Sequence, residues 1–218
     1  MSQVNVATEN KSFVQHHFVD AEQQFDTAKL GMWIFLVTEI LFFGGLFCAY
    51  VVFRSWYPQT FMEASGHLDK ILGGADTVDL ICSSVTMALA IHYIQVGKEK
   101  LTFILLGITF LFGAAFIGSH LYEWLDEMSV GIYPGSAYAF KGISDPHAYV
   151  FFTLYYLMTG LHGIHVLVGM GLMAWLMVKT KRGRFSSEYY TPIEITGLYW
   201  HFVDLIWIFL LPLLYLVD

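Results

Sequence analysis

The stretch LGMWIFLVTEILFFGGLFCAYVVF, from Leu30 to Phe53, decides the fold class because it contains a single charged residue, Glu39. A transmembrane helix needs about 20 consecutive, mainly apolar residues to cross the hydrocarbon core of a bilayer. Four more runs of this kind follow, at Thr77–Val96, Leu101–Tyr122, Ala148–Val178 and Ile193–Leu216. The sequence therefore predicts an all-α integral membrane bundle of five transmembrane helices.

The composition of the whole chain supports this class. Of its 218 residues, 56% are apolar and only 13% are charged, and the mean hydropathy is +0.58. Soluble globular domains have about a quarter of their residues charged and under half apolar, so that class is excluded. The net charge of −7, without a patch rich in Lys and Arg, argues against a nucleic-acid partner.

Basic residues near the helix ends predict the orientation. With five spans, the N-terminus and the second and fourth connections share one side of the membrane. That side carries eight basic residues: Lys11, Lys29, Lys98, Lys100, Lys179, Lys181, Arg182 and Arg184. The opposite side carries three: Arg54, Lys70 and Lys141. Because connections rich in Lys and Arg stay in the cytoplasm, we expect a cytoplasmic N-terminus and a C-terminus outside.

The chain is predicted to divide into a cytoplasmic segment, residues 1–28, and a five-helix membrane domain, residues 29–218. The segment 1–28 lacks the basic start and short apolar run of a signal peptide. Its apolar residues Val14, Phe18, Ala21 and Phe25 recur at helical spacing. This pattern leaves two interpretations open, an amphipathic helix on the membrane surface or a polar tail without one.

Ionisable residues inside the apolar runs are the candidates for function, because a charge in hydrocarbon is costly. Glu39 lies roughly 14 Å into the first helix at a rise of about 1.5 Å per residue, near the middle of the bilayer. Its carboxyl either holds helices together through hydrogen bonds or binds protons or lipid.

Two polar pairs lie on the fourth and fifth runs. His162 and His165 are three residues apart, as are His201 and Asp204, so each pair is expected to occupy one face of its helix. Interhelical hydrogen bonding is the favoured interpretation. A metal or haem site is the alternative, although the Glu-x-x-His spacing of di-iron bundles is absent.

Charged residues at the ends of these two helices are also candidates. Lys179, Arg182 and Arg184 follow the fourth run, where they form either a solvated basic flank or a site for an anionic lipid headgroup. Glu194 opens the fifth helix, where a carboxylate suits the positive end of the helix dipole. We therefore expect Glu194, His201 and Asp204 to form an interhelical polar cluster.

Three motifs together resemble subunit III of haem-copper respiratory oxidases. They are GMWIFLVTEILFFGGLFCAY at 31–50, TGLHGIHVLVG at 159–169 and YWHFVDLIW at 199–207. The resemblance covers nearly the whole chain from Lys29 onward. Members of that family have seven helices or, in many bacterial enzymes, five, and this chain is similar to the five-helix form. The long connection between the third and fourth runs, and the region of His120 and Glu123, depart from the family pattern.

The resemblance implies a non-catalytic subunit of a proton-pumping terminal oxidase, the complex that reduces dioxygen to water, in the bacterial inner (cytoplasmic) membrane. Subunit I is the implied direct partner, with subunit II and others in the complex. Haems and copper belong to those partner subunits, and bound phospholipid is implied for this chain. The candidate lipid-binding or proton-related residues are Glu39, His162, His165, Lys179, Arg182 and Arg184.

Two other functions are considered. One is an accessory subunit of a nitric oxide reductase. The other is a proton-coupled carrier that uses Glu39 with the His/Asp pairs, for which we find neither an inverted repeat nor a broken helix. Cytochrome c and quinol are not distinguished as electron donors, because the donor site lies on other subunits of such oxidases.

Overall fold

The computed structural model describes residues 14–217, which form helices and no strand. The helices are α1 (Ala21–Trp56), α2 (Pro58–Ser65), α3 (Lys70–Gln95), α4 (Glu99–Ser129), the 3-10 turn η1 (Gly135–Ala137), α5 (Ala148–Lys181) and α6 (Thr191–Leu214). Five of them, α1, α3, α4, α5 and α6, are long and apolar enough to span a membrane. The predicted all-α class with five transmembrane helices is therefore confirmed.

Side-chain caps make two of these helices begin before the apolar runs do. Asp20 precedes α1 and its carboxylate accepts a hydrogen bond from the backbone N–H of Gln23 at 2.8 Å. Asp69 precedes α3 and accepts from the N–H groups of Ile71 and Leu72 at 2.9 and 3.1 Å. A capping carboxylate satisfies N–H groups that have no partner within the helix, so each helix starts at a polar residue outside its apolar run.

The N-terminal segment differs from the interpretation as a separate surface helix. Residues 14–20 contain no helix, and Ala21 and Phe25 belong to the first turns of the long helix α1. The cap at Asp20 explains the difference, because it starts a helix that continues directly into the transmembrane span. Residues 1–13 of the expected surface helix lie outside the described residues.

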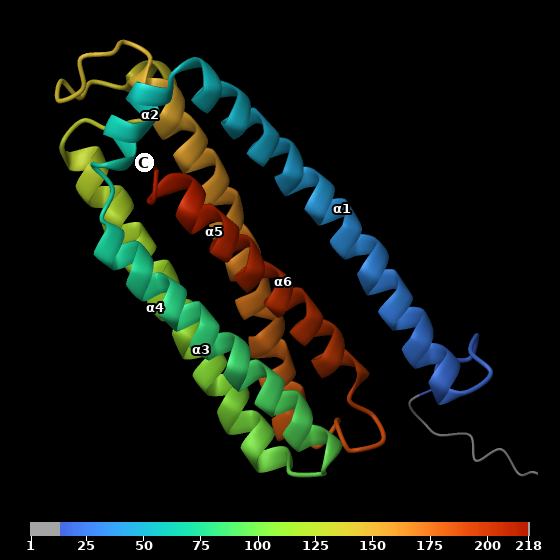
Figure 1. The fold of residues 1–218 in the computed structure, drawn as a ribbon. Coiled ribbons are helices and arrows are strands. Elements are labelled where there is room, and N and C mark those ends of the chain that lie inside the picture. The colour runs from blue at the N-terminus through green and yellow to red at the C-terminus, as the bar shows by residue number, and fades with distance from the viewer. Residues whose placement is uncertain (1–13, 218) are drawn as a thin grey trace, which may run out of the picture.

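Four of the long helices form a ring. α3 packs against α4, α4 against α5, α5 against α6, and α6 against α3. Helix α1 lies outside this ring along α5 and α6, and the short helix α2 covers the start of α5 (Figure 1). The molecule is thus a four-helix unit with a fifth spanning helix on one flank.

Trp200 of α6 fills the centre of the ring. It is fully buried, and its indole N–H donates to the Ser83 hydroxyl on α3 at 3.0 Å. Gly113 on α4 and Gly169 on α5 flank the ring so closely that a Cβ would lie 2.9 and 2.7 Å, respectively, from Trp200 carbons. These two glycines therefore allow the aromatic core to form between three helices.

Helix α1 is held by a narrow stripe. Its buried residues, Leu36, Phe43 and Tyr50, are spaced seven apart and therefore share one face. At one end of this stripe the Tyr50 hydroxyl donates to the carbonyl of Leu213. That carbonyl lies in the last turn of α6, where carbonyls have no partner within the helix.

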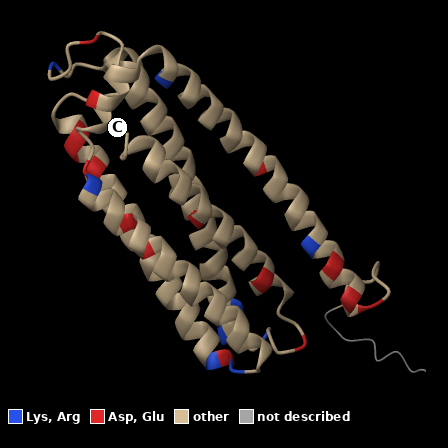
Figure 2. Ribbon diagram, in the orientation of Figure 1, with Lys and Arg blue, Asp and Glu red and all other residues tan. Residues whose placement is uncertain are grey.

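The charged residues are distributed unequally between the two ends of the bundle (Figure 2). The start of α1 and the α3–α4 and α5–α6 connections share one end, whereas α2, the α4–α5 connection and the end of α6 share the other. The first end, here called the basic end, carries Lys98, Lys100, Lys179, Lys181, Arg182 and Arg184. The side of the membrane that each end faces remains a prediction.

Candidate functional site

Glu39 of α1 and His165 of α5 meet where these two helices pack. The His165 Nε2 lies 3.1 Å from the Glu39 Oε2, and the side chains of His165 and Glu39 are 18% and 17% exposed, respectively. The ring of Phe43 packs on the imidazole at a centroid distance of 5.2 Å. The only acidic residue of the first apolar run therefore has a partner on another helix.

The hydrogen bonds of His165 define where the protons lie. Its Nδ1 is 2.7 Å from the carbonyl oxygen of Leu161. A carbonyl only accepts, so Nδ1 carries a proton. A proton must also lie between Nε2 and the Glu39 carboxyl, either on the acid beside a neutral imidazole or on an imidazolium beside a carboxylate. The pair is neutral overall in both forms, which avoids an unpaired charge among apolar helices.

His162 does not join this pair, although it lies only three residues before His165 on α5. His162 is 1% exposed and lies among aromatic rings, with centroid distances of 5.3 Å to Phe116 and 5.4 Å to Trp207. Helix α5 contacts α1 on one side and α4 and α6 on others. Residues three apart differ by about 60° around a helix of 3.6 residues per turn, which is enough to direct the two imidazoles to different neighbours.

His201 and Asp204 both contact α3. The Ser84 hydroxyl lies 2.7 Å from the His201 Nδ1, and the Ser83 hydroxyl donates to the Asp204 carboxylate at 3.4 Å. Glu194 is not part of this cluster, contrary to expectation, and instead forms a 2.7 Å ion pair with Lys29 of α1. Glu194 lies in the first turn of α6 at the basic end, about two turns from His201.

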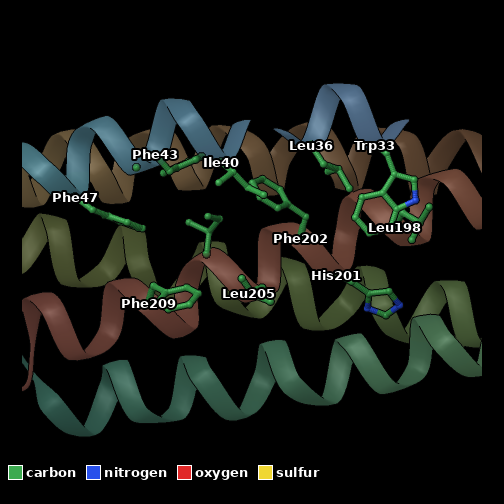
Figure 3. A pocket seen from close by; sticks show the side chains of 12 residues that line it. Trp33, Leu36, Ile40, Phe43, Phe47, Leu198, His201, Phe202, Leu205 and Phe209 are labelled. Atoms are coloured by element: carbon green, nitrogen blue, oxygen red, sulfur yellow. The ribbon is translucent and has the colours of Figure 1, made fainter. Parts of the chain in front are cut away.

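A groove of about 520 Å³ runs between α1 and α6 (Figure 3). Its lining is almost wholly apolar and consists of Trp33, Leu36, Ile40, Phe43, Gly44, Phe47, Leu198, His201, Phe202, Leu205, Ile206 and Phe209. Glu39 and His165 do not line it. The groove lies on one flank of the Leu36–Phe43 stripe of α1, and Glu39 lies on the other.

A second cavity, of about 550 Å³, lies at the basic end beside the connection from α5 to α6. Lys179 and Arg184 line it together with Trp175, Phe185 and Tyr189. The Lys179 ammonium is 5.6 Å from the centre of the Trp175 ring. Arg182 is not part of this lining, so two of the three predicted basic residues are brought together.

At the opposite end, buried carboxyls are present that the reading of the sequence missed. Asp76, Glu123 and Glu127 are 1%, 4% and 6% exposed, although all three lie just outside the predicted apolar runs. A signal for two of them existed: His120, Glu123 and Glu127 continue the buried face of α4 at helical spacing. Mean hydropathy does not detect this spacing, because a carboxyl lowers the hydropathy of a segment whether its side chain is buried or exposed.

A polar contact outside the spans joins α2 to the connection before α5. The Thr60 hydroxyl donates to the Asp145 carboxylate, and the backbone N–H of His147 donates to it at 2.8 Å. These hydrogen bonds, that of Thr60 foremost, hold the pKa of Asp145 below its usual range. The contact fixes the chain between the ends of α1 and α5.

The ionisable side chains of the described residues are not arranged as a metal site. Across residues 14–217 no three His, Cys, Asp or Glu side chains are placed so that they could hold a metal ion.

Comparison with known proteins places these features in a family context. The family model described as cytochrome c oxidase subunit III matches residues 5–218. A cytochrome c oxidase subunit 3 of Thermostichus vulcanus is 32% identical over 207 residues, which cover 91% of each chain. A protein of the same name from Synechocystis sp. is 31% identical over 197 residues, 88% of this chain and 76% of the relative. A Staphylococcus aureus protein named probable quinol oxidase subunit 3 is 30% identical over 191 residues, 87% and 89% of the two chains.

Proposed function

We propose that this chain, which belongs to the cytochrome c oxidase subunit III family, supports the catalytic subunit of a proton-pumping oxidase without carrying its redox centres. Its relatives are subunits of cytochrome c or quinol oxidases, which are terminal oxidase complexes. The observation that carries the proposal is a family match along nearly the entire chain. In the proposal, haems and copper on subunits I and II reduce dioxygen to water.

The proposed location is the cytoplasmic membrane of a bacterium, with the basic end in the cytoplasm. Five helices of spanning length support a multi-pass membrane protein. The unequal distribution of Lys and Arg supports the orientation, since such residues are retained on the cytoplasmic side.

The proposed contact with subunit I involves the flank that carries α1. Most of the large apolar side chains of α1 are exposed, among them Trp33 at 56%, Ile40 at 55% and Leu41 at 71%. Within the chain this helix is held by one stripe of three buried residues. Lipid and a neighbouring subunit would cover the remaining surface of α1 in the complex.

Phospholipid binding is proposed at two places. The apolar groove between α1 and α6 fits acyl chains, because it offers almost no polar group. The cavity with Lys179 and Arg184 fits an anionic headgroup, since two cations line it at the membrane end of α5. A lipid with its acyl chains in the groove would fill the surface between this subunit and its partner.

The Glu39–His165 pair is proposed to take part in proton uptake. It holds one proton between two groups that can each accept it, 3.1 Å apart. Both side chains are partly exposed on the flank of the chain, so a proton can be exchanged with a polar group of a neighbouring subunit that covers this flank.

The first experiment tests membership of an oxidase complex. The chain is purified from its native membrane, its partner proteins are identified, and the haems are identified by absorption. We expect co-purification with subunits I and II, and activity with cytochrome c or with quinol then identifies the donor. Failure to find any haem-containing subunit with the chain after gentle extraction of the native membrane would contradict the proposal.

The second experiment tests the headgroup site in the purified complex. The double variant Lys179→Gln, Arg184→Gln should lose anionic phospholipid, as measured by mass spectrometry. It should also lose activity over many turnovers while the initial rate is largely kept. Arg182→Gln is the matched control, because Arg182 lies next to the cavity without lining it. Equal lipid retention in the double variant and the control would refute the site.

The third experiment concerns the proton. Glu39→Gln keeps the size of the side chain and can donate an amide N–H to the His165 Nε2, but it has no exchangeable acid proton. We expect normal assembly and an altered pH dependence of proton uptake. An unchanged pH profile would show that the pair has only a structural role.

A further inference from the structure

A second set of ionisable side chains lies inside the four-helix unit, separate from the Glu39–His165 pair. His120, Glu123 and Glu127 occupy positions i, i+3 and i+7 of α4 and therefore form one stripe. Each is at most 6% exposed. Asp76 of α3 is 1% exposed and completes the group, here called the α4 carboxyl cluster. The cluster lies at the end of the bundle opposite the basic end.

Hydrogen bonds within the cluster satisfy only part of it. The Ser119 hydroxyl donates to the Asp76 Oδ1, and the Tyr215 hydroxyl donates to the Glu123 Oε2 at 2.6 Å. The Nδ1 of His120 lies 3.5 Å from the same Glu123 oxygen, in reach of a charge interaction but not of a good hydrogen bond. Each of these contacts leaves further polar atoms of the same side chains unused.

The unused atoms are numerous and fully enclosed. Within residues 14–217 no hydrogen bond of good geometry reaches the second oxygens of Asp76 and Glu123, the carboxyl oxygens of Glu127 or the ring nitrogens of His120. The hydroxyls of Tyr155 and Tyr156 interact with Glu123 and Glu127 more weakly. His120 is 5% exposed and directed toward Glu123. Proteins satisfy buried polar atoms of this kind with ordered water or with an ion. The imidazole therefore points independently to a ligand held among the carboxyls.

The charges around the cluster do not neutralise it. Across residues 14–217 none of its three carboxyls forms an ion pair with Lys or Arg. The nearby charged groups are acidic: Asp69, Asp79 and Asp126. The facing titratable groups of α5 and the end of α6 are Tyr155, Tyr156, His162 and Tyr215. Ionisation of all three carboxyls would place like charges together without a counterion, which bound protons prevent.

We propose that the α4 carboxyl cluster is a proton-binding site, in which Asp76, Glu123 and Glu127 share protons with His120 through buried water. Coupled carboxyls bind protons in successive steps over a wide range of pH. Exchange with the solvent is expected at the Glu127 end, because Glu127 lies in the last turn of α4, next to the connection outside the span. A metal ion is the competing ligand, and no three of these groups are placed to hold one in the described part of the chain.

The site goes beyond the proposed function of the chain, since it does not involve Glu39, the lipid sites or the partner subunits. Its position at the end opposite the basic residues would place it on the outer side of the membrane in the proposed orientation. The test below measures protons on this chain's own carboxyls, so its outcome is independent of the identity of the oxidase.

The experiment is infrared difference spectroscopy of the purified native complex during pH changes in H₂O and D₂O. The C=O stretch of a protonated carboxyl is the signal. We expect the wild-type complex to show the C=O stretch of protonated carboxyls at neutral pH. The Glu127→Gln variant should lose the part of this signal that comes from one of the three cluster carboxyls. The exposed neighbour provides the control, because Asp126→Asn should leave the neutral-pH signal unchanged. Glu39→Gln should change only the signal of its own pair.

Several results would overturn the proposal. A wild-type complex without protonated carboxyl signal at neutral pH would do so before any variant is made. An unchanged signal in Glu127→Gln would also overturn it. If Glu127→Gln fails to assemble, Glu123→Gln replaces it in the test, because the amide oxygen of the new glutamine can still accept the hydrogen bond from Tyr215. Elemental analysis that finds a stoichiometric metal, lost in Glu127→Gln, would assign the cluster to a cation instead.

Discussion

Helices α1 and α6 are both spanning helices, but they occupy opposite kinds of position. Twelve of the 24 residues of α6 are buried within the chain, against three of the 36 residues of α1. Yet α1 contains the more apolar segment of the two. In a membrane protein, the apolar character of a helix therefore indicates contact with the bilayer, and it does not show that the helix is buried within the protein. The large exposed face of α1 indicates a helix that completes its packing with lipid or a neighbouring subunit.

The largest expected difference between these helices concerns one tryptophan in each. Trp200→Ala should lower the stability of the chain by about 3–5 kcal/mol, because it empties the centre of the four-helix ring. Trp33→Ala removes the same side chain from α1, where it is 56% exposed, and should leave the stability of the isolated chain nearly unchanged. Thermal unfolding in detergent measures both. Similar losses in the two variants would show that α1 is part of the core.

A smaller effect is expected from two glycines of α5, one of which faces α6. Gly169→Ala places a methyl group 2.7 Å from Trp200 and should destabilise the chain by about 1–3 kcal/mol through overpacking. Gly171→Ala is the matched control, since no atom lies within 4 Å of the added group. It should be neutral or slightly stabilising because alanine favours the helix. A loss of stability in the control alone would contradict the packing around α6.

The polar contact between α6 and α3 should contribute less. Ser84→Ala and His201→Ala each remove one partner of the 2.7 Å contact, and the double variant removes both. Hydrogen bonds of this kind between membrane helices are worth about 0.6 kcal/mol on average. A double-mutant cycle on unfolding measures the coupling between them, and strictly additive effects would show that the contact does not help to hold α6.

The smallest effect is expected outside the spans, where the short helix after α1 is joined to the connection before α5. The Asp145 pKa is lower in the folded chain than when unfolded. Its contribution to stability is therefore complete above the unfolded pKa of about 4 and is lost as the pH falls through the lower, folded value. Limited proteolysis near residues 58–65 should increase only at acidic pH. Thr60→Ala should weaken this pH dependence, and an identical acid profile in both proteins would rule out the contact.

The sequence predicted the spanning segments and singled out Glu39 as a candidate, but it did not reveal which residues pair with each other. Glu39 was identified because one carboxyl interrupts an otherwise apolar run. Its pairing with His165 was not identified, since the two residues are 126 positions apart. His162 and Glu194 were grouped with the wrong neighbours, because spacing along one helix does not reveal which helices surround it.

What the sequence alone determined is the number of membrane spans and the class of the protein, because the free energy of placing about 20 residues in a bilayer depends on those residues themselves. What only the tertiary structure decided is how the polar groups combine. The ring of α3, α4, α5 and α6 encloses Glu123 and Glu127, which lie beyond the end of the third apolar run. The packing also gives His162 and His165 different neighbouring helices. Burial and pairing depend on which helices pack together, and that is a property of the whole fold rather than of any one segment.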